Sequence, residues 1–266
     1  MKHMTRLFAL LMAVMMIGLC TAQAETALER VKAAGKIVVG TEATYPPYEY
    51  LDDQAQFAGC DIWLAQQIAD ALGVTLEIRD MAFDGIIPSV EAGQIDLGIA
   101  AFTVTPERAE VIDFSHQYEL SNQLLIVKAG NKDKYADKES MKGLRVGAQL
   151  GTIQSQLVEK ALPDSELFEL PTYPELGLET MNGNIVGFVV DQAVGESMIA
   201  TSNGELEAAA FTFTAEEASF GKAAVVRKGS EDLMEAINEV IDRVVEDGSY
   251  QAAYDAAVAA SGATGE

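Results

Sequence analysis

Apolar runs and amphipathic stretches alternate along the first part of the chain. The run Ile-Val-Val within 36–40 predicts a buried strand, and 61–72 places apolar residues at the three- and four-residue spacing of one helix face. Further strands are predicted at 74–78 and 96–100, helices at 25–35 and 86–92, and a polar, proline-interrupted loop at 41–53. Strands that alternate with helices indicate an α/β domain with a largely parallel sheet.

A second series of the same kind begins near Leu124. The predicted strands cover 124–128, 145–148, 166–169, 185–190 and 221–227, and the predicted helices cover 152–161, 174–182, 192–201, 230–247 and 249–260. Each series carries a turn with Gly or Thr directly after a strand. Ligands in such sheets bind beside the carboxyl ends of strands, so the pattern predicts two lobes that close on one cleft.

The first 24 residues read as a secretory signal peptide. Lys2 and Arg6 precede an apolar run over 7–19, and Ala22-Gln-Ala24 forms a small-x-small cleavage site. The apolar run is too short to span a membrane. Cleavage after Ala24 is therefore expected, with lipid attachment at Cys20 as the less favoured alternative because Leu19 precedes it.

The remaining chain is strongly acidic. The leader holds two of the 18 basic residues and none of the 41 acidic ones, so the 242 residues that follow carry a formal net charge of -25. Such a charge argues against binding to nucleic acids or anionic membranes. Cys60 is the one cysteine after the leader, which excludes an internal disulfide and favours a small buried side chain.

The usual sequence signatures of several enzyme classes are missing. There is no dinucleotide-binding Gly-x-Gly-x-x-Gly, no phosphate-binding loop and no Gly-x-Ser-x-Gly elbow. Beyond the leader, His116 is the only histidine, so a histidine-based triad or metal cluster is hard to build. We therefore expect no metal, no cofactor and no enzymatic activity.

One cation stands in an unusual place. Thr105 suits a helix N-cap and Pro106 the first helical position, which puts Arg108 in the first turn, beside the positive end of the helix dipole. Our hypothesis is that Arg108 grips a carboxylate with its guanidinium fork. The alternative is a surface pair with Glu107 or Glu110.

Other candidates lie at predicted strand ends. Asp191 can supply an anion and can also N-cap the helix that follows, because the two roles are compatible. Gly151-Thr152 opens a helix whose amides can meet a carboxylate, or forms an ordinary turn. Thr103 offers a hydroxyl and an N–H group. The aromatic residues near turns that could sandwich a ligand side chain are Tyr45, Tyr48 and Phe83.

These residues belong to motifs that occur in a known order. The chain resembles the polar amino-acid-binding proteins of bacterial extracellular solute-binding family 3, over nearly its whole length after the leader. The motifs that carry this resemblance are Gly40-Thr-Glu-Ala-Thr-Tyr45-Pro-Pro-Tyr-Glu-Tyr50, Gly59-Cys-Asp61, Phe83-Asp-Gly-Ile-Ile-Pro88, Gly93-Gln-Ile-Asp96, Phe102-Thr-Val-Thr-Pro-Glu-Arg108, Val111-Ile-Asp-Phe-Ser115, Gly143-Leu-Arg-Val-Gly147, Gly151-Thr152, Val190-Asp191, Gly221 and Gly248-Ser-Tyr250.

The resemblance implies a two-lobed α/β fold of the type II periplasmic-binding-protein kind, each lobe a mainly parallel sheet flanked by helices. Lobe 1 would be discontinuous and lobe 2 continuous, joined by two hinge strands. It also implies a periplasmic receptor, expected to be a monomer, that delivers an amino acid to an ABC transporter permease. The expected boundaries are 25–117 and 221–266 for lobe 1, 123–215 for lobe 2, and 118–122 and 216–220 for the hinges.

The family also implies roles for individual residues. Arg108 would bind the α-carboxylate with N–H groups near Thr103 and Thr152-Ile153. Asp191, Thr103 and the Ala101 carbonyl would bind the α-ammonium. The side chain would lie between Tyr45 and Phe83, near Glu42, Gln149 and Asp61. The full expected set is Glu42, Tyr45, Phe83, Ala101, Phe102, Thr103, Arg108, Gln149, Thr152, Ile153 and Asp191.

Departures from the family pattern affect the side-chain end of the site. Glu42 stands where relatives usually have Asp, Cys60 replaces Phe, Ala101 replaces a common Gly or Ser, and Ile153 narrows the pocket. Glu42 with Gln149 favours arginine, lysine, histidine or glutamine and disfavours acidic ligands. The alternatives are a secreted cyclohexadienyl (prephenate or arogenate) dehydratase with Glu42 as general acid, and a ligand module of a sensor system.

Overall fold

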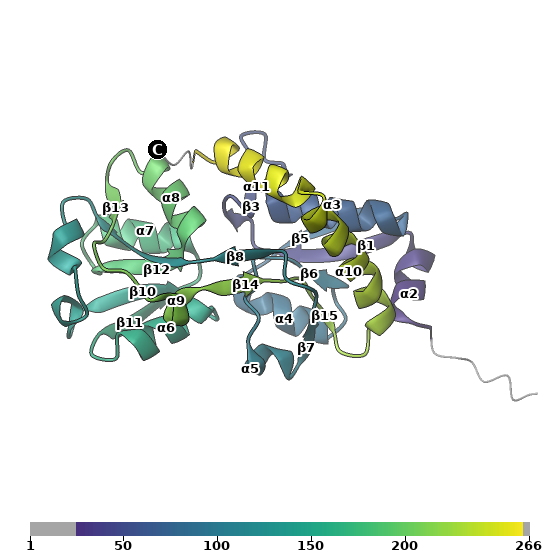
Figure 1. The fold of residues 1–266 in the computed structure, drawn as a ribbon, viewed down its shortest axis with the longest axis horizontal. Helices are drawn as coiled ribbons and strands as arrows, with labels where there is room; N and C mark the ends of the chain where they lie inside the picture. The colour runs from purple at the N-terminus through teal and green to yellow at the C-terminus, as the bar shows by residue number, and fades with distance from the viewer. Residues whose placement is uncertain (1–24, 263–266) are drawn as a thin grey trace, which may run out of the picture.

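The computed structural model describes residues 25–262. The predicted leader 1–24, its cleavage site after Ala24 and the alternative lipid site at Cys20 lie outside the described residues. The chain forms two lobes, each built on a five-stranded sheet flanked by helices (Figure 1). This confirms the predicted two-lobed α/β fold.

The sheet of lobe 1 has helices on both faces. The N-terminal strand β1 (Lys36–Thr41) buries Ile37 and Val39 on one face and Val38 on the other, as the two-residue period of a strand requires. The first face packs against α2 (Ala27–Ala34), α3 (Cys60–Leu72), α10 (Glu231–Glu246) and α11 (Ser249–Ala260), and the second against α4 (Phe83–Glu91). The strand order is β5 (Thr75–Asp80), β1, β6 (Leu97–Gly98), β15 (Val225–Arg227), β7 (Ile112–Phe114).

The sheet of lobe 2 repeats this design. Its order is β11 (Glu166–Leu170), β10 (Arg145–Gln149), β12 (Gly187–Asp191), β9 (Gln123–Lys128), β13 (Leu206–Ala208). The helices are α6 (Ile153–Ala161) on one face and α7 (Tyr173–Met181) and α8 (Gln192–Thr201) on the other, with short 3-10 turns at Lys132–Tyr135 and Glu139–Met141. In both lobes the central strand pairs are parallel, whereas β15 and β9 pair antiparallel with their neighbours, so the sheets are more mixed than predicted.

Two strands run side by side between the lobes (Figure 1). They are β8 (Glu119–Ser121) and β14 (Phe220–Lys222), which pair antiparallel. The predicted strand over 221–227 is in fact two strands, β14 and β15. The predicted hinge segment 216–220 begins instead in helix α9 (Ala215–Ala218), because Thr214 and Glu217 form a capping box that starts a helical turn. The exact lobe boundaries stay a prediction.

The segment predicted as a loop over 41–53 contains short strands. They are β2 (Thr44–Tyr45), β3 (Glu49–Leu51) and β4 (Phe57–Ala58), which form a small antiparallel sheet. Strands of two or three residues are too short to show a periodic pattern. Two other local predictions are confirmed: Thr105 caps α5 (Pro106–Ala109), and Cys60 is fully buried. No helix within 25–262 has the length and apolar character to cross a bilayer.

One of the two strands between the lobes, β8, carries an acidic side chain, Glu119, that is hydrogen-bonded to two tyrosines. Glu119 of β8 accepts hydrogen bonds from the hydroxyl groups of Tyr48, at 2.8 Å, and Tyr250, at 3.2 Å. Burial raises the pKa of Glu119 to about 7, because the charged form loses water that the two hydroxyl groups do not fully replace. The folded state therefore holds a proton here more tightly than the unfolded chain.

This pKa predicts a pH dependence of stability. Because its pKa is raised in the folded state, Glu119 stabilises the protein most at low pH, and this contribution is lost as pH rises from about 4.5 through about 7. We expect Glu119→Gln to reduce the fall in unfolding free energy between pH 5 and pH 8 by roughly 2 kcal/mol. Urea unfolding followed by circular dichroism measures it. Glu239→Gln, at an exposed position of α10, is the matched control, and an unchanged fall in Glu119→Gln would contradict the assignment.

Candidate functional site

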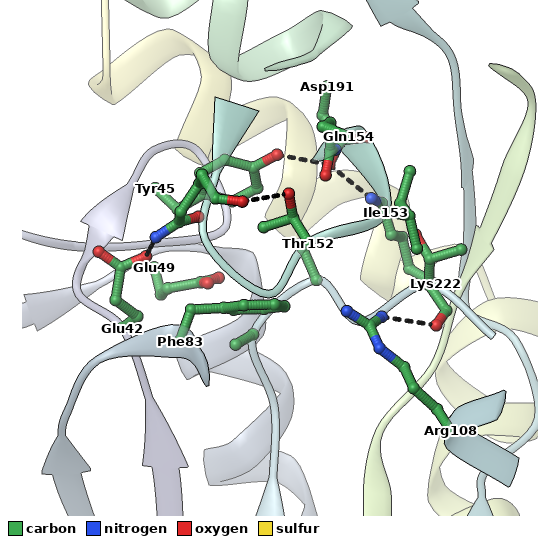
Figure 2. Close-up of a pocket in the computed structure, with 14 residues that line it drawn as sticks. Glu42, Tyr45, Glu49, Phe83, Arg108, Thr152, Ile153, Gln154, Asp191 and Lys222 are labelled. Carbon is green, nitrogen blue, oxygen red and sulfur yellow. Dashed lines mark hydrogen bonds and ion pairs between the residues drawn. The ribbon is translucent and has the colours of Figure 1, made fainter. Parts of the chain in front are cut away.

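One cavity lies between the lobes, at the carboxyl ends of strands from both sheets. Figure 2 shows Arg108 and Glu42 on opposite sides of this cavity. The residues that line it are Glu42, Tyr45, Glu49, Phe83, Ala100, Ala101, Thr103, Arg108, Gln149, Thr152, Ile153, Gln154, Asp191 and Lys222.

Arg108 points into the cavity from the first turn of α5. Its two terminal nitrogens donate to the Thr103 carbonyl at 2.9 Å and the Gly151 carbonyl at 3.1 Å, and its guanidinium lies over the rings of Phe83 and Phe102 at 5.5 and 5.4 Å. Neither Glu107 nor Glu110 forms an ion pair with it within the described chain, so the surface-pair alternative is wrong. Burial lowers its pKa to about 10, which leaves it cationic at neutral pH with donors to spare.

Asp191 ends β12 and is 1% exposed. One carboxylate oxygen accepts from the Ser121 hydroxyl at 2.8 Å and the Gln123 amide at 2.5 Å. The other accepts from the Tyr45 hydroxyl at 2.6 Å and the Lys222 ammonium at 2.5 Å. Asp191 occupies the N-cap position of α8 but caps no amide. Its carboxylate therefore belongs to the cavity, and the predicted capping of α8 by this side chain is not found.

Glu42 follows β1 and is also buried. Its carboxylate accepts from the Thr44 hydroxyl and, across the two lobes, from the Gln149 side-chain amide at 2.9 Å. The same amide donates to the Pro171 carbonyl at 2.7 Å. Burial raises the pKa of Glu42, and the two hydrogen bonds partly offset that effect. Both donors on the Gln149 nitrogen are used, which leaves its oxygen as an acceptor for a ligand.

The buried carboxylate of Asp61 holds the loop that carries Ala101 and Thr103. Ala101 has a φ of 46°, an unusual conformation for a residue with a Cβ. Asp61 accepts from its amide at 2.7 Å and from the Tyr118 hydroxyl at 3.0 Å, and burial raises the pKa of Asp61 to about 6. Asp61 does not line the cavity. Asp61 supports the loop. The resemblance had instead placed it near the tip of a ligand side chain.

On the lobe 2 side, the start of α6 lines the cavity. Thr152 caps this helix and donates its hydroxyl to the Gln149 carbonyl at 2.6 Å. The first amides of a helix lack partners within it, so they favour an anion there. Gly151, with φ +76°, approaches lobe 1 so closely that an added Cβ would lie 2.9 Å from the Cβ of Asp84. A glycine is therefore needed where the lobes meet.

Of the other predicted residues, some line the cavity and some do not. Tyr45 and Phe83 line the cavity as expected, whereas Tyr48 is buried and donates to Glu119. Phe102 does not line it but stacks beneath Phe83, with ring centroids 4.8 Å apart. His116 is exposed and pairs with Asp242 at 2.8 Å, which agrees with a surface role.

Four lining residues were not foreseen: Ala100, Glu49, Gln154 and Lys222. Glu49 lies in the small antiparallel sheet that the pattern missed. Lys222 carried a usable signal, because a charge inside the otherwise apolar run 221–226 calls for a buried partner. Within residues 25–262, no group of three or more His, Cys, Asp or Glu residues could hold a metal ion.

Comparison with known proteins gives consistent matches. The sequence pattern of the bacterial extracellular solute-binding proteins, family 3, matches residues 37–258. The chain is 30% identical over 228 residues to the L-cystine-binding protein TcyJ of Escherichia coli (strain K12), which covers 86% of this chain and 84% of that protein.

Solved structures of amino-acid-binding proteins also resemble this chain. An amino acid ABC transporter substrate-binding protein, AbpA, from Streptococcus pneumoniae bound to L-arginine has a TM-score of 0.84 and 32% identity, covering 88% of this chain and 99% of that one. An ancestral arginine-binding protein, solved with arginine and with glutamine, has a TM-score of 0.77 and 36% identity, covering 84% of this chain and 97% of that one.

Proposed function

The chain belongs to the bacterial extracellular solute-binding proteins, family 3, and we propose that it is a periplasmic receptor that delivers a polar or cationic L-amino acid to the permease of an ABC importer. One observation carries this proposal. A single buried cavity joins Arg108 to two anionic side chains, Asp191 and Glu42. An amino acid with a cationic or donor-bearing side chain has matching groups: a carboxylate, an ammonium and a further donor.

In the proposed complex, the ligand carboxylate meets Arg108 and the first amides of α6. These groups combine a guanidinium fork with a helix N-terminus, both of which favour an anion. The α-ammonium meets Asp191 and the carbonyl of Ala101, with Thr103 beside it. Tyr45 and Phe83 flank the ligand side chain.

The far end of the cavity selects the side chain. Glu42 supplies a buried carboxylate and Gln149 a free amide oxygen, and both accept hydrogen bonds. We infer that arginine, lysine, histidine and glutamine are favoured, and that glutamate and aspartate are repelled by Glu42. The relatives solved with arginine or glutamine agree with this choice.

Closure of the lobes completes the site. Contacts from Arg108 to Gly151 and from Gln149 to Glu42 join residues of the two lobes. A ligand held by both lobes shifts the equilibrium towards the closed form because it binds that form better. We propose β8 and β14 as the hinge, with lobe 1 formed by 25–117 and 221–266 and lobe 2 by 123–215.

The proposed cellular location follows from the family and from the predicted signal peptide over 1–24. We propose export to the periplasm with cleavage after Ala24, and function as a monomer. Intact mass and N-terminal sequencing of the exported protein distinguish this cleavage from lipid attachment at Cys20. Size-exclusion chromatography with light scattering checks the monomer.

A catalytic role is not part of this proposal. The family and the relatives described above are binding proteins. Burial raises the pKa of Glu42, as a general acid requires. However, the Thr44 hydroxyl and the Gln149 amide both donate to its carboxylate and favour the ionised form. Turnover of prephenate or arogenate would contradict the receptor proposal.

A thermal-shift screen of the twenty amino acids tests the receptor directly. A ligand at about 100 times its Kd stabilises the folded state by about 2.7 kcal/mol, which raises the Tm of a chain of this size by roughly 5–10 °C. We expect this shift from one or more of arginine, lysine, histidine and glutamine, and none from aspartate or glutamate. A flat response to all twenty would refute the proposal.

Arg108→Ala should weaken binding of the amino acid found in that screen by about 3–5 kcal/mol, because the ligand carboxylate is left buried and unpaired. Isothermal titration calorimetry measures this change, and circular dichroism confirms the fold. Arg145→Ala is the matched control: Arg145 begins β10, lies over Phe168 and is exposed, so its loss should leave affinity intact. Near wild-type affinity in Arg108→Ala would sink the assignment.

Glu42→Gln should change selectivity more than overall affinity. The variant keeps the shape of the side chain but removes the negative charge, so it should lose more affinity for L-arginine than for L-glutamine, by about tenfold. Calorimetry with both ligands gives the ratio. If both affinities match the wild type, Glu42 does not contact the ligand side chain.

A further inference from the structure

Lys222 is the most unexpected residue of the cavity. It is 1% exposed, and its ammonium lies 2.5 Å from one carboxylate oxygen of Asp191. Among the described residues, Asp191 is its one hydrogen-bond acceptor, and the ring of Tyr48 lies 5.8 Å away. A buried ammonium needs such a partner, because its charge is costly to remove from water.

The carboxylate of Asp191 has no room for another donor. A carboxylate offers about four lone-pair sites. Tyr45, Ser121, Gln123 and Lys222 each donate one hydrogen bond, two to each oxygen. A ligand ammonium therefore reaches Asp191 only by replacing one of these donors.

Lys222 is the donor best suited to be replaced. It is the only cation of the four, so a ligand ammonium restores the charge that its departure removes. Its backbone is fixed, because it bridges to Thr103 and its carbonyl accepts from the Tyr118 amide at 2.9 Å. Its four-carbon stem can still turn without moving that backbone.

We propose that Lys222 is a specificity-determining residue that competes with the ligand's α-ammonium for Asp191. The proposal rests on the receptor function described above and names the ligand group that this competition affects. An amino acid must displace the lysine ammonium before its own ammonium can bind. A carboxylate ligand with the same side chain and no α-amino group leaves the Lys222–Asp191 pair intact.

A second acceptor is available for the displaced ammonium. Glu49 lines the same cavity and is 1% exposed, and its Oε2 has no hydrogen-bond partner among the described residues. Asp61 has a similarly unpartnered buried oxygen, Oδ1. Burial raises the pKa values of Glu49, Asp61 and Glu119, and the nearby Lys222 ammonium opposes that rise in all three, so Lys222 already lies close to these acidic groups.

This competition predicts an unusually small contribution of the α-amino group to binding. The wild-type protein should discriminate weakly between an amino acid and its deamino analogue. Removal of the lysine frees one lone pair of Asp191 and leaves three donors on the carboxylate. The α-ammonium then gains a charged partner with no internal competitor.

The test is calorimetry with two probes, L-arginine and 5-guanidinopentanoic acid, which is arginine without its α-amino group. We expect Lys222→Met to bind L-arginine about tenfold more tightly than the wild type and to leave the affinity for the analogue unchanged or lower. The ratio of the two affinities therefore rises at least about tenfold. If the screen selects glutamine instead, the probes are L-glutamine and 4-carbamoylbutanoic acid.

Lys228→Met is the matched control. Lys228 is exposed and pairs with Asp113 at 3.1 Å, so this variant removes the same charge without touching the cavity. Its affinity ratio should equal that of the wild type. If Lys222→Met fails to fold by circular dichroism, Lys222→Gln serves in its place. Its neutral amide competes for Asp191 less strongly than an ammonium, so the affinity ratio should still rise, by a smaller factor.

Two outcomes overturn the inference alone. They are an unchanged affinity ratio in the Lys222 variant, and weaker binding of L-arginine by that variant while the wild type binds it. A different outcome overturns the receptor proposal as well: no amino acid stabilises either the wild type or the variant in the thermal-shift screen.

Discussion

The structure depends on one buried carboxylate. Asp191 ends a strand of lobe 2, and its four donors come from lobe 1, from β8, from β9 and from β14. An ionised carboxylate is stable in an interior only when its hydrogen-bonding sites are filled. Both lobes and the two strands between them, β8 and β14, therefore each supply a donor to this one carboxylate. The same requirement makes the position suitable for a ligand ammonium.

The cavity is built from groups that serve two purposes. Arg108 reaches the Gly151 carbonyl across the lobes, Gln149 reaches Glu42, and Tyr45 reaches Asp191. Each pair joins the lobes and also presents a group that an amino acid can use. In the proposed complex, binding and closure are therefore coupled through the same side chains, as expected when a ligand binds one of two conformations better.

Much of this arrangement could be predicted from local patterns. The Thr105-Pro106 start of α5 and the Gly151-Thr152 start of α6 were read correctly, because capping and backbone conformation depend on near neighbours in the chain. The order of motifs identified the family, and the family placed Arg108 and Asp191 in the same cleft. Two predictions were wrong because of longer-range contacts: Asp61 supports a loop, and Phe102 lies beneath the cavity wall. The predicted hinge segment 216–220 was wrong for a local reason, because the capping box of Thr214 and Glu217 starts α9.

The sequence by itself determined the two α/β series, the helix starts that aim Arg108 and Thr152, and the acidic character of the chain. Only the tertiary structure decided which charged and polar side chains meet. Lys222 and Asp191 are 31 residues apart, and Glu42 and Gln149 are 107 apart. No local rule relates such residues, because their contact depends on how two separately formed sheets come together. For that reason the proposed amino-group subsite contains Lys222, a residue that the sequence analysis did not single out.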